Sequence, residues 1–533
     1  MRGTEHAENP EPLPSLSASS GPVFVACDMG TTLIKAAVID LSGTILSIHA
    51  VDSVLIMPSA GVVEQDLLEI EASARTAIRE AVAQSGRAAD IAGVSFSSQM
   101  SGIGSVDADF APAAPFDSWL DSRGSRDITE MAVHKNEVTR ISGCPPSYSH
   151  GTKIRWMKRE RPEEYARTVA FQVPGPFVAA RAAGLPASEA FIDKTNLCFS
   201  NLSDTKNGVW SAHLCELFGV DIAKLPRIVD PLDVIGHVSA ATAADTGIPE
   251  GTPIAAGGGD QLVACLGAGI TQPGLASDSA GTASLLAFCL DTWAPDDLQH
   301  TLVTSQAIGS DNFIAFSFIN GGGLGLEWLR KELVDPSLDS ATAFGRLQER
   351  AMDIRPGSDG LLWLPHFQGG VLPPMPYRRS GWVGLMAGHT VAHLYRAILE
   401  GIALQYASWV APVTEKTGEM LHEVRAMGGG SKSDLWLQIK ADVLGIPFRR
   451  MADAECALLG NSLIAATATG HIDDLAAAAA ALHSIGESIK PDPERHTFYR
   501  ELSAIFDQLT VSVDPVFARL QEMASRSPAS SRG

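Results

Sequence analysis

The sequence predicts an α/β protein of two related domains, each a β-sheet flanked by helices, placed around a central cleft. The first observation is a β-hairpin pattern at Val23–Asp40, where two apolar runs flank a Gly/Thr turn. The second is a similar pattern one half-chain later, at Ala276–Phe288. The third is the alternation of short apolar strands with helical stretches along the chain, which is typical of α/β folds.

The turn of the first hairpin has residue types that suit phosphate binding. Gly30 lets the backbone approach a ligand closely because it has no Cβ, and Thr31 and Thr32 add hydroxyls beside backbone N–H groups. Asp28 would orient a hydrated Mg²⁺, and Lys35 would offset phosphate charge. A tight structural turn with a buried Asp28 fits the same residues, and the hairpin alone leaves both interpretations open.

The second hairpin favours the phosphate interpretation. Gly281 and Thr282 occupy the places that Gly30 and Thr31 have in the first copy. Two such hairpins, one opening each half, indicate a duplicated domain that closes on a nucleotide from both sides. Ser279 stands where the first copy has its aspartate, so we expect the second hairpin to hold phosphate without metal.

Composition and charge limit the partners of the chain. A net charge of −21 over 533 residues argues against nucleic acid or an anionic membrane as the main partner. The seven cysteines are scattered without a C-x-x-C pair, which fits a reducing compartment, and we expect a cytoplasmic protein. No run of about 20 apolar residues predicts a membrane span.

Both ends of the chain are expected to be tails. Residues 1–20 are rich in Pro, Ser and Glu and lack the apolar run of a signal peptide, so we expect a disordered segment. Residues 516–533 are expected to form a C-terminal tail.

Polar residues follow the strand predicted at Ile91–Phe96, and open α/β sheets bind ligands at such strand ends. Gln99 offers a donor and an acceptor to a polyol, and Met100 would pack against a carbon backbone. An ordinary loop glutamine remains the alternative.

A second polar cluster contains Trp119, Asp121 and Arg123. A carboxylate and a guanidinium beside an aromatic ring suit sugar hydroxyls and the apolar face of a sugar. A surface ion pair would have the same sequence. Lys153, on a basic amphipathic helix, is interpreted as a structural charge that is solvated or faces the helix.

A glycine-rich strand–helix junction presents a single acid. Residues 257–259 are three glycines, followed by Asp260 and Gln261 and a small helix. An aspartate at a helix start is usually an N-cap. The glycines permit close approach and the second hairpin follows shortly, so a catalytic role for Asp260 is favoured, and the two roles are compatible.

A second glycine loop joins a strand at Val424–Met427 to a helix at Asp434–Leu444. Its residues are Gly428, Gly429, Gly430 and Ser431, and the bare backbone would suit a flat adenine ring. The chain has no P-loop, dinucleotide-binding, zinc-protease or nucleophile-elbow motif.

Taken together, these motifs resemble those of the FGGY family of carbohydrate kinases, within the actin-like (ribonuclease H-like) superfamily of sugar kinases and chaperone ATPases. The likeness covers about Val23 to Pro515, nearly the whole chain. It includes both hairpins, the Asp260 junction, the Gly428–Gly430 loop and a signature at Gly381–Leu385 with Leu394–Glu400. It implies an N-terminal sugar-binding domain at 21–255 and a C-terminal nucleotide-binding domain at 256–515.

The resemblance also implies roles for the site residues. Asp260 would accept the proton of a sugar hydroxyl, and Asp28 with Asp260 would hold Mg²⁺ beside ATP. The two hairpins and the Gly428–Ser431 loop would bind the nucleotide. The sugar would contact Asp260 and the set Gln99, Met100, Trp119, Asp121, Arg123 and Gln261.

Within the family the sugar-side residues look most like those of xylulokinases. Ser101 and the Gly369–Pro373 loop depart from that pattern, and His150 stands where the family's N-terminal signature prefers a small residue or Pro. We therefore expect a sugar kinase acting on a primary hydroxyl, with a ketopentose such as D-xylulose as substrate and a possible homodimer. The alternatives are another ketose, a sugar alcohol of the erythritol or glycerol type, a signalling sugar, a non-catalytic sugar-binding regulator, or an actin-like ATPase.

Overall fold

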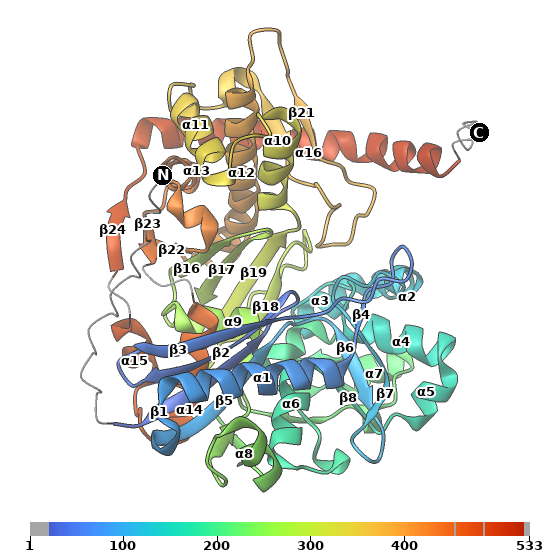
Figure 1. Cartoon of the computed structure of the whole chain (residues 1–533). Coiled ribbons are helices and arrows are strands. Elements are labelled where there is room, and N and C mark those ends of the chain that lie inside the picture. The colour runs from blue at the N-terminus through green and yellow to red at the C-terminus, as the bar shows by residue number, and fades with distance from the viewer. Residues whose placement is uncertain (1–20, 452–454, 483–484, 527–533) are drawn as a thin grey trace, which may run out of the picture.

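The computed structural model describes residues 21–451, 455–482 and 485–526. Two lobes, each built around a seven-stranded sheet, stack one above the other in Figure 1. The predicted α/β fold with a duplicated sheet is confirmed. The predicted disordered segment, residues 1–20, lies outside the described residues.

The first hairpin begins the sheet of the lower lobe. Strands β1 and β2 pair in antiparallel fashion with Asp28 opposite Lys35, and β5 lies parallel to β1 on its other side. The path runs β13-β14-β5-β1-β2-β3, and β15 adds to β5. Its strands are β1 (Val23–Met29), β2 (Leu33–Asp40), β3 (Ile45–Asp52), β5 (Ile91–Ser98), β13 (Val234–His237), β14 (Pro253–Ala255) and β15 (Gly258–Gly259).

The sheet of the upper lobe repeats this order. Its path β19-β17-β16-β22-β23 matches β3-β2-β1-β5-β14, including the antiparallel hairpin and the parallel strand beside it. The predicted second hairpin is therefore the first of its lobe. The strands are β16 (Leu275–Ala280), β17 (Ser284–Leu290), β18 (Val303–Gln306), β19 (Phe313–Ile319), β22 (Glu423–Met427), β23 (Phe448–Met451) and β24 (Ile485–Ile489).

Helices cover both faces of the first sheet. Val25 and Cys27 of β1 pack toward α1 (Leu67–Ser85), whose N-cap is Asp66 as predicted. Ala26, on the opposite face, packs against α14 (Cys456–Ala468). This division follows from the two-residue period of a strand. Helices α6 (Pro174–Ala183) and α8 (Ala240–Thr246) complete the α1 side.

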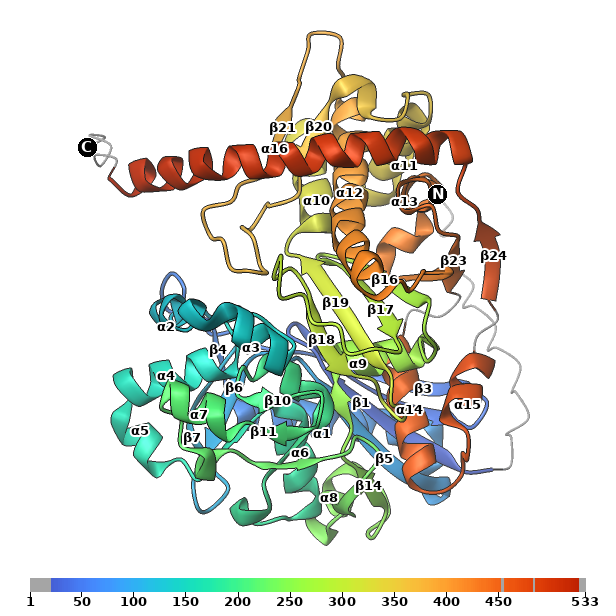
Figure 2. The ribbon, with the colours of Figure 1, turned by 180° about the vertical axis from the view of Figure 1, so that it is seen from behind.

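Helix α14 belongs to the C-terminal half of the sequence but lies in the lower lobe, with α15 (Leu475–Ala481) beside it (Figure 2). The chain thus returns to the first sheet before β24. A segment of residues 21–255 alone therefore does not complete the lower lobe. The expected boundary separates α14 from the strands that it covers.

A smaller α/β region extends from the lower lobe. It holds a four-stranded sheet and five helices: β4 (Glu64–Gln65), β6 (Ile103–Val106), β7 (Pro112–Asp117), β8 (Ala170–Gln172), α2 (Ser125–Met131), α3 (Lys135–Ser142), α4 (His150–Glu160), α5 (Pro162–Arg167) and α7 (Ala212–Phe218). Short strand pairs β9 (Phe191–Asp193) with β12 (Arg227–Val229) and β10 (Ser203–Asp204) with β11 (Val209–Trp210) accompany them.

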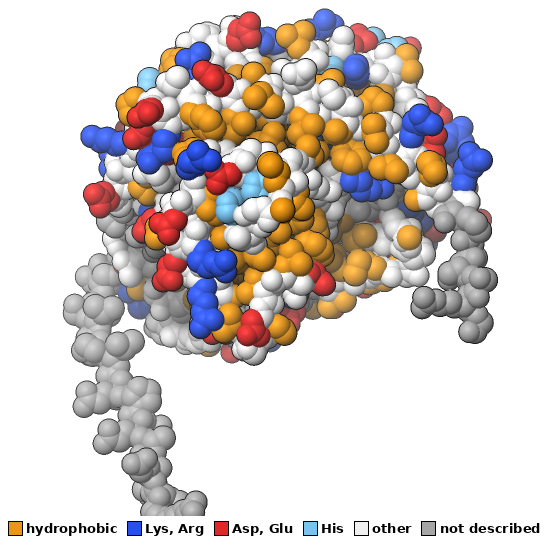
Figure 3. All heavy atoms as spheres, turned by 90° about the horizontal axis from the view of Figure 1, so that it is seen from above, with side chains coloured by type: hydrophobic (Ala, Val, Ile, Leu, Met, Phe, Trp, Pro, Cys, Tyr) orange, Lys and Arg blue, Asp and Glu red, His pale blue; other side chains and the backbone are white. Residues whose placement is uncertain are grey.

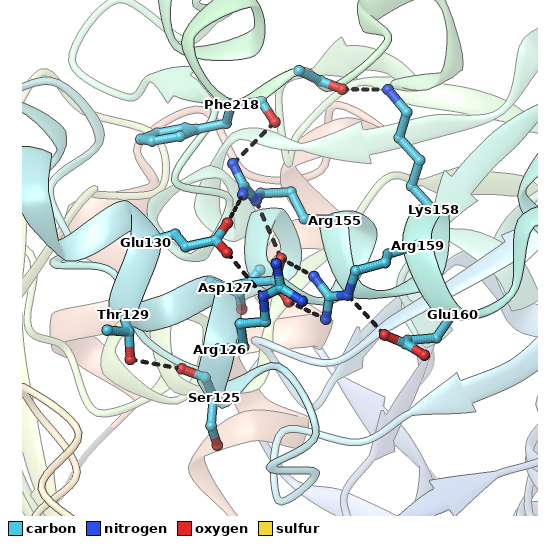
Figure 4. A network of polar contacts seen from close by, with 12 residues as sticks. Ser125, Arg126, Asp127, Thr129, Glu130, Arg155, Lys158, Arg159, Glu160 and Phe218 are labelled. Atoms are coloured by element: carbon cyan, nitrogen blue, oxygen red, sulfur yellow. Dashed lines mark hydrogen bonds and ion pairs between the residues drawn. The ribbon is translucent and has the colours of Figure 1, made fainter.

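Buried Asp127 joins α2 to α4. Its carboxylate accepts from Arg159 at 2.8 and 3.0 Å and from Arg155 at 3.3 Å (Figure 4). Because both cations come from α4, the network fixes the helix that follows the Trp119–Arg123 loop.

The upper lobe is helical outside its sheet. Its remaining elements are α9 (Asp260–Gly267), α10 (Gly322–Leu333), α11 (Ser340–Met352), α12 (Val391–Thr417), α13 (Asp434–Leu444), α16 (Pro493–Ser525) and the hairpin β20 (Leu362–Leu364) with β21 (Gly381–Val383). Helix α16 continues through Pro515, so residues 516–525, expected in a tail, are helical.

The outer face of the upper lobe mixes apolar and charged side chains (Figure 3). Exposed Leu385 and Met386 lie in the loop after β21. Within the described part of the chain, no helix combines the length and apolarity that a bilayer crossing requires.

Candidate active site

A cavity of about 710 Å³ opens between the lobes. Thr31 comes from the first hairpin, Gly281 and Thr282 come from the second, and Asp260 comes from the start of α9. The two hairpins and the acid predicted from the sequence therefore meet at one cavity.

The first hairpin is linked to Trp119, one of the residues predicted to bind the sugar. The indole N–H of Trp119 donates to Thr31 Oγ1 at 2.8 Å. Because that oxygen accepts from Trp119, the Thr31 hydroxyl proton is available to another acceptor, such as a phosphate oxygen. Thr32 is exposed at the turn. Gly30 donates its N–H to the Leu33 carbonyl, which closes the turn.

The second hairpin meets the start of α10. A Cβ on Gly323 would lie 2.0 Å from the Gly281 carbonyl oxygen, so only glycine permits this approach. Gly281 and Thr282 are exposed to the cavity. Helix N-termini favour anions because their N–H groups are free and their dipole is positive there. This end of the cavity therefore suits phosphate.

The Gly428–Ser431 loop lies directly behind the second hairpin. A Cβ on Gly430 would lie 2.5 Å from the Ala280 Cβ and 2.6 Å from the Trp436 ring, and Gly428 has φ +76° beside the Ala280 carbonyl. Ser431 donates to the Gly428 carbonyl at 2.8 Å. The loop does not line the cavity itself but adjoins its phosphate end.

Asp260 is the first residue of α9, and Gly259 is the N-cap. Its Oδ1 accepts from the Gln261 N–H at 2.7 Å. Burial and the nearby negative charge of Asp28 raise the pKa of Asp260 to about 8, although the Gln261 hydrogen bond lowers it. A carboxylate with a pKa near the working pH suits proton transfer.

Asp28 lies behind the cavity at the end of β1. Burial raises the pKa of Asp28, while a hydrogen bond from Ser97 at 2.6 Å and the charge of Lys35 oppose that rise. Lys35 is held by Glu455 through contacts of 2.8 and 2.9 Å and does not line the cavity. Its expected role beside phosphate has no direct contact to support it.

Asp28 and Asp260 fit the chemistry of a Mg²⁺ site. The two desolvated carboxylates repel one another, and a divalent cation would relieve that repulsion. No cluster of three or more potential ligands occurs among the described residues. Mg²⁺ typically uses one or two carboxylates together with substrate phosphates and water, and Asp28 and Asp260 would supply two.

Gln99, Met100, Trp119 and Gln261, which are predicted to bind the sugar, all lie at the cavity wall. Gln99 donates its amide to Gln65 at 2.7 Å, and its buried Oε1 has no hydrogen-bond partner among the residues that the structure describes. A ligand hydroxyl could therefore donate to that oxygen. Met100 packs against Gly259, where a Cβ would lie 2.5 Å from its sulfur.

Asp121 and Arg123 lie behind this wall and do not line the cavity. Arg123 contacts Asp121 at 2.9 Å, Asp117 at 2.6 Å and Glu64 at 2.8 Å. Burial lowers the pKa of Arg123, but these carboxylates outweigh burial and raise it. The pair is thus part of a largely buried ionic cluster rather than a surface ion pair, and its predicted contact with the sugar stays a prediction.

Lys153 was expected to be a charge that is either solvated or faces the helix. The solvated alternative is wrong. The Lys153 side chain is buried, and Nζ donates to the Asp121 carbonyl at 3.0 Å. Burial lowers the pKa of Lys153 to about 8. It therefore supports the same loop as Arg123.

The aromatic part of the cavity wall was not predicted from the sequence. Phe199, Phe316 and Phe318 line it, and the Phe318 ring meets Trp119 across the lobes at 6.1 Å between centroids. Phe316 and Phe318 alternate on β19 in an apolar run that predicts a buried strand, but no local signal says that one face meets a cavity.

Comparison with known proteins agrees with this geometry. The N-terminal domain of the FGGY family of carbohydrate kinases matches residues 23–267, and its C-terminal domain matches residues 276–469. A xylulose kinase of Staphylococcus epidermidis is 24% identical over 91% of this chain and 96% of its own. An autoinducer-2 kinase of Klebsiella pneumoniae is 28% identical over 90% and 92%.

A solved structure gives the same result. The crystal structure of xylulose kinase from Rhodospirillum rubrum superposes with a TM-score of 0.84, at 26% identity, over 93% of this chain and 99% of its own. Since both family domains match in order and together cover most of the sequence, the chain belongs to the FGGY family of carbohydrate kinases.

Proposed function

We propose that this protein transfers the γ-phosphoryl group of ATP to a primary hydroxyl of a small sugar, with a ketopentose such as D-xylulose as substrate. The observation that carries the proposal is the position of Asp260 at a cavity lined by Thr31 and Thr282 of the two hairpins. The similarity to xylulose kinases supports the choice of sugar.

In the proposed reaction Asp260 accepts the proton of the sugar hydroxyl. The sugar oxygen then bonds to the γ-phosphorus in line as the bond to the β-phosphate oxygen breaks, and ADP leaves. Thr31 and Thr282 orient phosphate oxygens, and the Gly428–Ser431 loop adjoins the nucleotide. Most of the rate acceleration would come from positioning and charge stabilisation.

Asp28 and Asp260 would hold Mg²⁺, which would neutralise phosphate charge when bound. The Gln99 Oε1 would accept from a sugar hydroxyl, while Met100 and Trp119 would cover the carbon skeleton. Arg123, Asp121 and Lys153 would act indirectly, by holding the loop that carries Trp119.

The charge of the cavity wall supports an uncharged acceptor. Among the described residues at the wall, Asp260 is the one carboxylate, and none is Lys, Arg or His. An acidic or phosphorylated sugar would therefore meet no cationic side chain in the cavity, and desolvating its charge would be costly. Other ketoses, sugar alcohols and an uncharged signalling sugar remain the alternatives.

A coupled ADP-release assay over a panel of ketoses, aldoses, polyols and one sugar acid tests the proposal. We expect sugar-dependent turnover, highest for a ketopentose and absent for the acid. Sugar-independent ATP turnover would favour an actin-like ATPase, and no ATP consumption would favour a non-catalytic regulator. If a polyol is the best substrate, the proposed kinase activity stands but the proposed ketopentose substrate is wrong.

A cytoplasmic location is also part of the proposal. The buried thiols of Cys27, Cys144 and Cys265, none of them in a disulfide, fit a reducing compartment. The expected homodimer stays a prediction, which sedimentation equilibrium would test.

A further inference from the structure

Helix α14 contacts the elements that carry both acids of the site. It packs on β1, which contains Asp28, and on α9, which begins with Asp260. The two helices approach very closely: a Cβ on Gly460 would lie 2.0 Å from the Val263 carbonyl oxygen, and one on Gly267 would lie 1.8 Å from the Cys456 carbonyl oxygen. Because of this close packing, a small shift of α14 would also shift the elements that carry Asp28 and Asp260.

A chain of buried hydrogen bonds leads from α14 to Asp28. The Asn461 amide Nδ2 donates to Ser97 Oγ at 2.7 Å, and Ser97 Oγ donates to Asp28 Oδ1 at 2.6 Å. On the other side, Ser95 Oγ donates to Asn461 Oδ1 at 2.9 Å. Asn461, Ser95 and Ser97 are fully buried.

The direction of this chain is fixed by its neighbours. Asn461 Nδ2 also points at the Cys27 carbonyl, 3.4 Å away, which can only accept. The amide nitrogen must therefore lie on the Ser97 side. Because Ser97 Oγ accepts from Asn461, its proton is directed toward Asp28. One Asp28 oxygen is thus held by a donor whose orientation is set from the C-terminal half of the chain.

We propose that Asn461 is a positioning residue for Asp28, acting through Ser97 to orient the Asp28 carboxylate toward the Mg²⁺ that accompanies the nucleotide. This inference rests on the proposed function, since it presumes a metal–nucleotide ligand. Glu455, at the start of α14, gives a second hold through its ion pair with Lys35, the cross-strand partner of Asp28. One helix therefore sets the orientation of the acid and of its strand.

The proposal makes a different prediction from a purely structural role for Asn461. A helix anchor would change folding stability and affect all ligands alike. A residue that orients Asp28 would change only the Mg²⁺-dependent part of nucleotide binding, and Ser97 would share the effect. Groups that orient metal ligands from behind typically change metal affinity or activity by about 10–100-fold.

The experiment measures the dissociation constant of ADP by titration calorimetry, once in excess Mg²⁺ and once in EDTA. The variants are Asn461→Ala, Ser97→Ala and the double variant. The control is Ser462→Ala, on the same helix, where the serine Oγ donates to the Leu459 carbonyl. Thermal melting checks each fold, and Asn461→Leu, which keeps a similar shape without the N–H donor, replaces Asn461→Ala if that variant does not fold.

We expect Asn461→Ala and Ser97→Ala each to reduce the Mg²⁺-dependent gain in ADP affinity by about 10–100-fold, with affinity in EDTA unchanged. The double variant should lose no more than the singles because both act along one path. Ser462→Ala should match the wild type. An unchanged Mg²⁺ gain, or an equal loss in EDTA, overturns the inference.

Sugar-dependent ADP release by the wild type separates the two proposals. If the wild type turns over a sugar and the variants keep the full Mg²⁺-dependent increase in ADP affinity, Asn461 has no positioning role but the kinase proposal stands. If no sugar is turned over but the variants lose part of the Mg²⁺-dependent increase in ADP affinity, the proposed function is wrong and the positioning role of Asn461 stands. A wild type whose ADP affinity does not depend on Mg²⁺ overturns the inference.

Discussion

Asp260 gains its proposed role from its surroundings. Burial and the charge of Asp28 raise its pKa to about 8, so a proton can be taken up and released near neutral pH. We expect Asp260→Asn to retain the fold and the ADP affinity measured in EDTA while kcat falls by about 10²–10⁴, the contribution of a general base. Steady-state kinetics with calorimetry of ADP measures both. Near-normal turnover would remove Asp260 as the base.

Arg123 is proposed to support sugar binding indirectly, by holding the loop that carries Trp119. Arg123→Ala would leave Asp117, Asp121 and Glu64 without their shared cation and displace the loop that carries Trp119. We expect kcat/KM for the sugar to fall by up to about 10²-fold, mainly through KM, with KM for ATP little changed. Initial-rate kinetics in both substrates measures this.

Arg126→Ala is the matched control for that variant. Arg126 lies on α2, pairs with Glu130 and is mostly exposed. It should leave both KM values unchanged. If Arg123→Ala changes KM for sugar and KM for ATP equally, Arg123 does not support sugar binding.

His150 gives the stability a pH dependence. Burial and the charge of Lys153 lower the pKa of His150 to about 3, and its Nε2 has no partner. The folded pKa lies below the ordinary value of 6.5, so the unfolded chain binds the proton first as pH falls. Stability is therefore lost from pH 6.5 downward, by about 3 kcal/mol at pH 4.5.

His150→Gln should remove that loss. We expect the urea midpoint of the wild type to fall more between pH 7 and pH 4.5 than that of His150→Gln. His213→Gln, on the surface of α7, is the control and should behave as the wild type. Parallel midpoints for wild type and His150→Gln would contradict the assignment.

At the scale of elements, the Gly428–Ser431 loop depends on close packing against the second hairpin. A methyl group from Gly430→Ala would meet Ala280 and Trp436 at 2.5 and 2.6 Å. Overpacking of this kind costs about 1–3 kcal/mol. We expect KM for ATP to rise by about tenfold with KM for sugar little changed, because the loop adjoins the nucleotide end.

Gly345→Ala provides the control for that substitution. Gly345 lies within α11 with nothing near its Cβ position, so alanine should leave kinetics unchanged and raise helix stability by about 0.5–1 kcal/mol. A normal KM for ATP in Gly430→Ala would show that this loop does not contribute to nucleotide binding.

At the scale of the whole molecule, the two lobes touch through an aromatic pair. Trp119 of the lower lobe and Phe318 of the upper lobe meet edge to face. Such pairs contribute about 0.5–1.5 kcal/mol. A double-mutant cycle with Trp119→Ala and Phe318→Ala, measured on kcat/KM for the sugar, should give a coupling energy in that range. Strict additivity would show that the lobes do not cooperate in sugar binding.

The sequence by itself determined the features that depend on neighbouring residues. The Gly/Thr turns predicted both hairpins, Asp66 predicted the start of α1, and the glycine junction predicted where Asp260 begins a helix. These signals are local, because turn conformation, capping and strand period are set within a few residues. The resemblance then added the order in which the motifs meet around the cleft.

The tertiary structure alone decided which distant residues meet. Lys153 is buried beside Asp121, Lys35 pairs with Glu455, and Asn461 reaches Ser97 from a helix in the other half of the chain. A charged or polar residue has the same local pattern whether it faces water or a buried partner. Its environment is fixed only when the sheets and helices pack, because burial and electrostatic pairing are properties of the assembled fold.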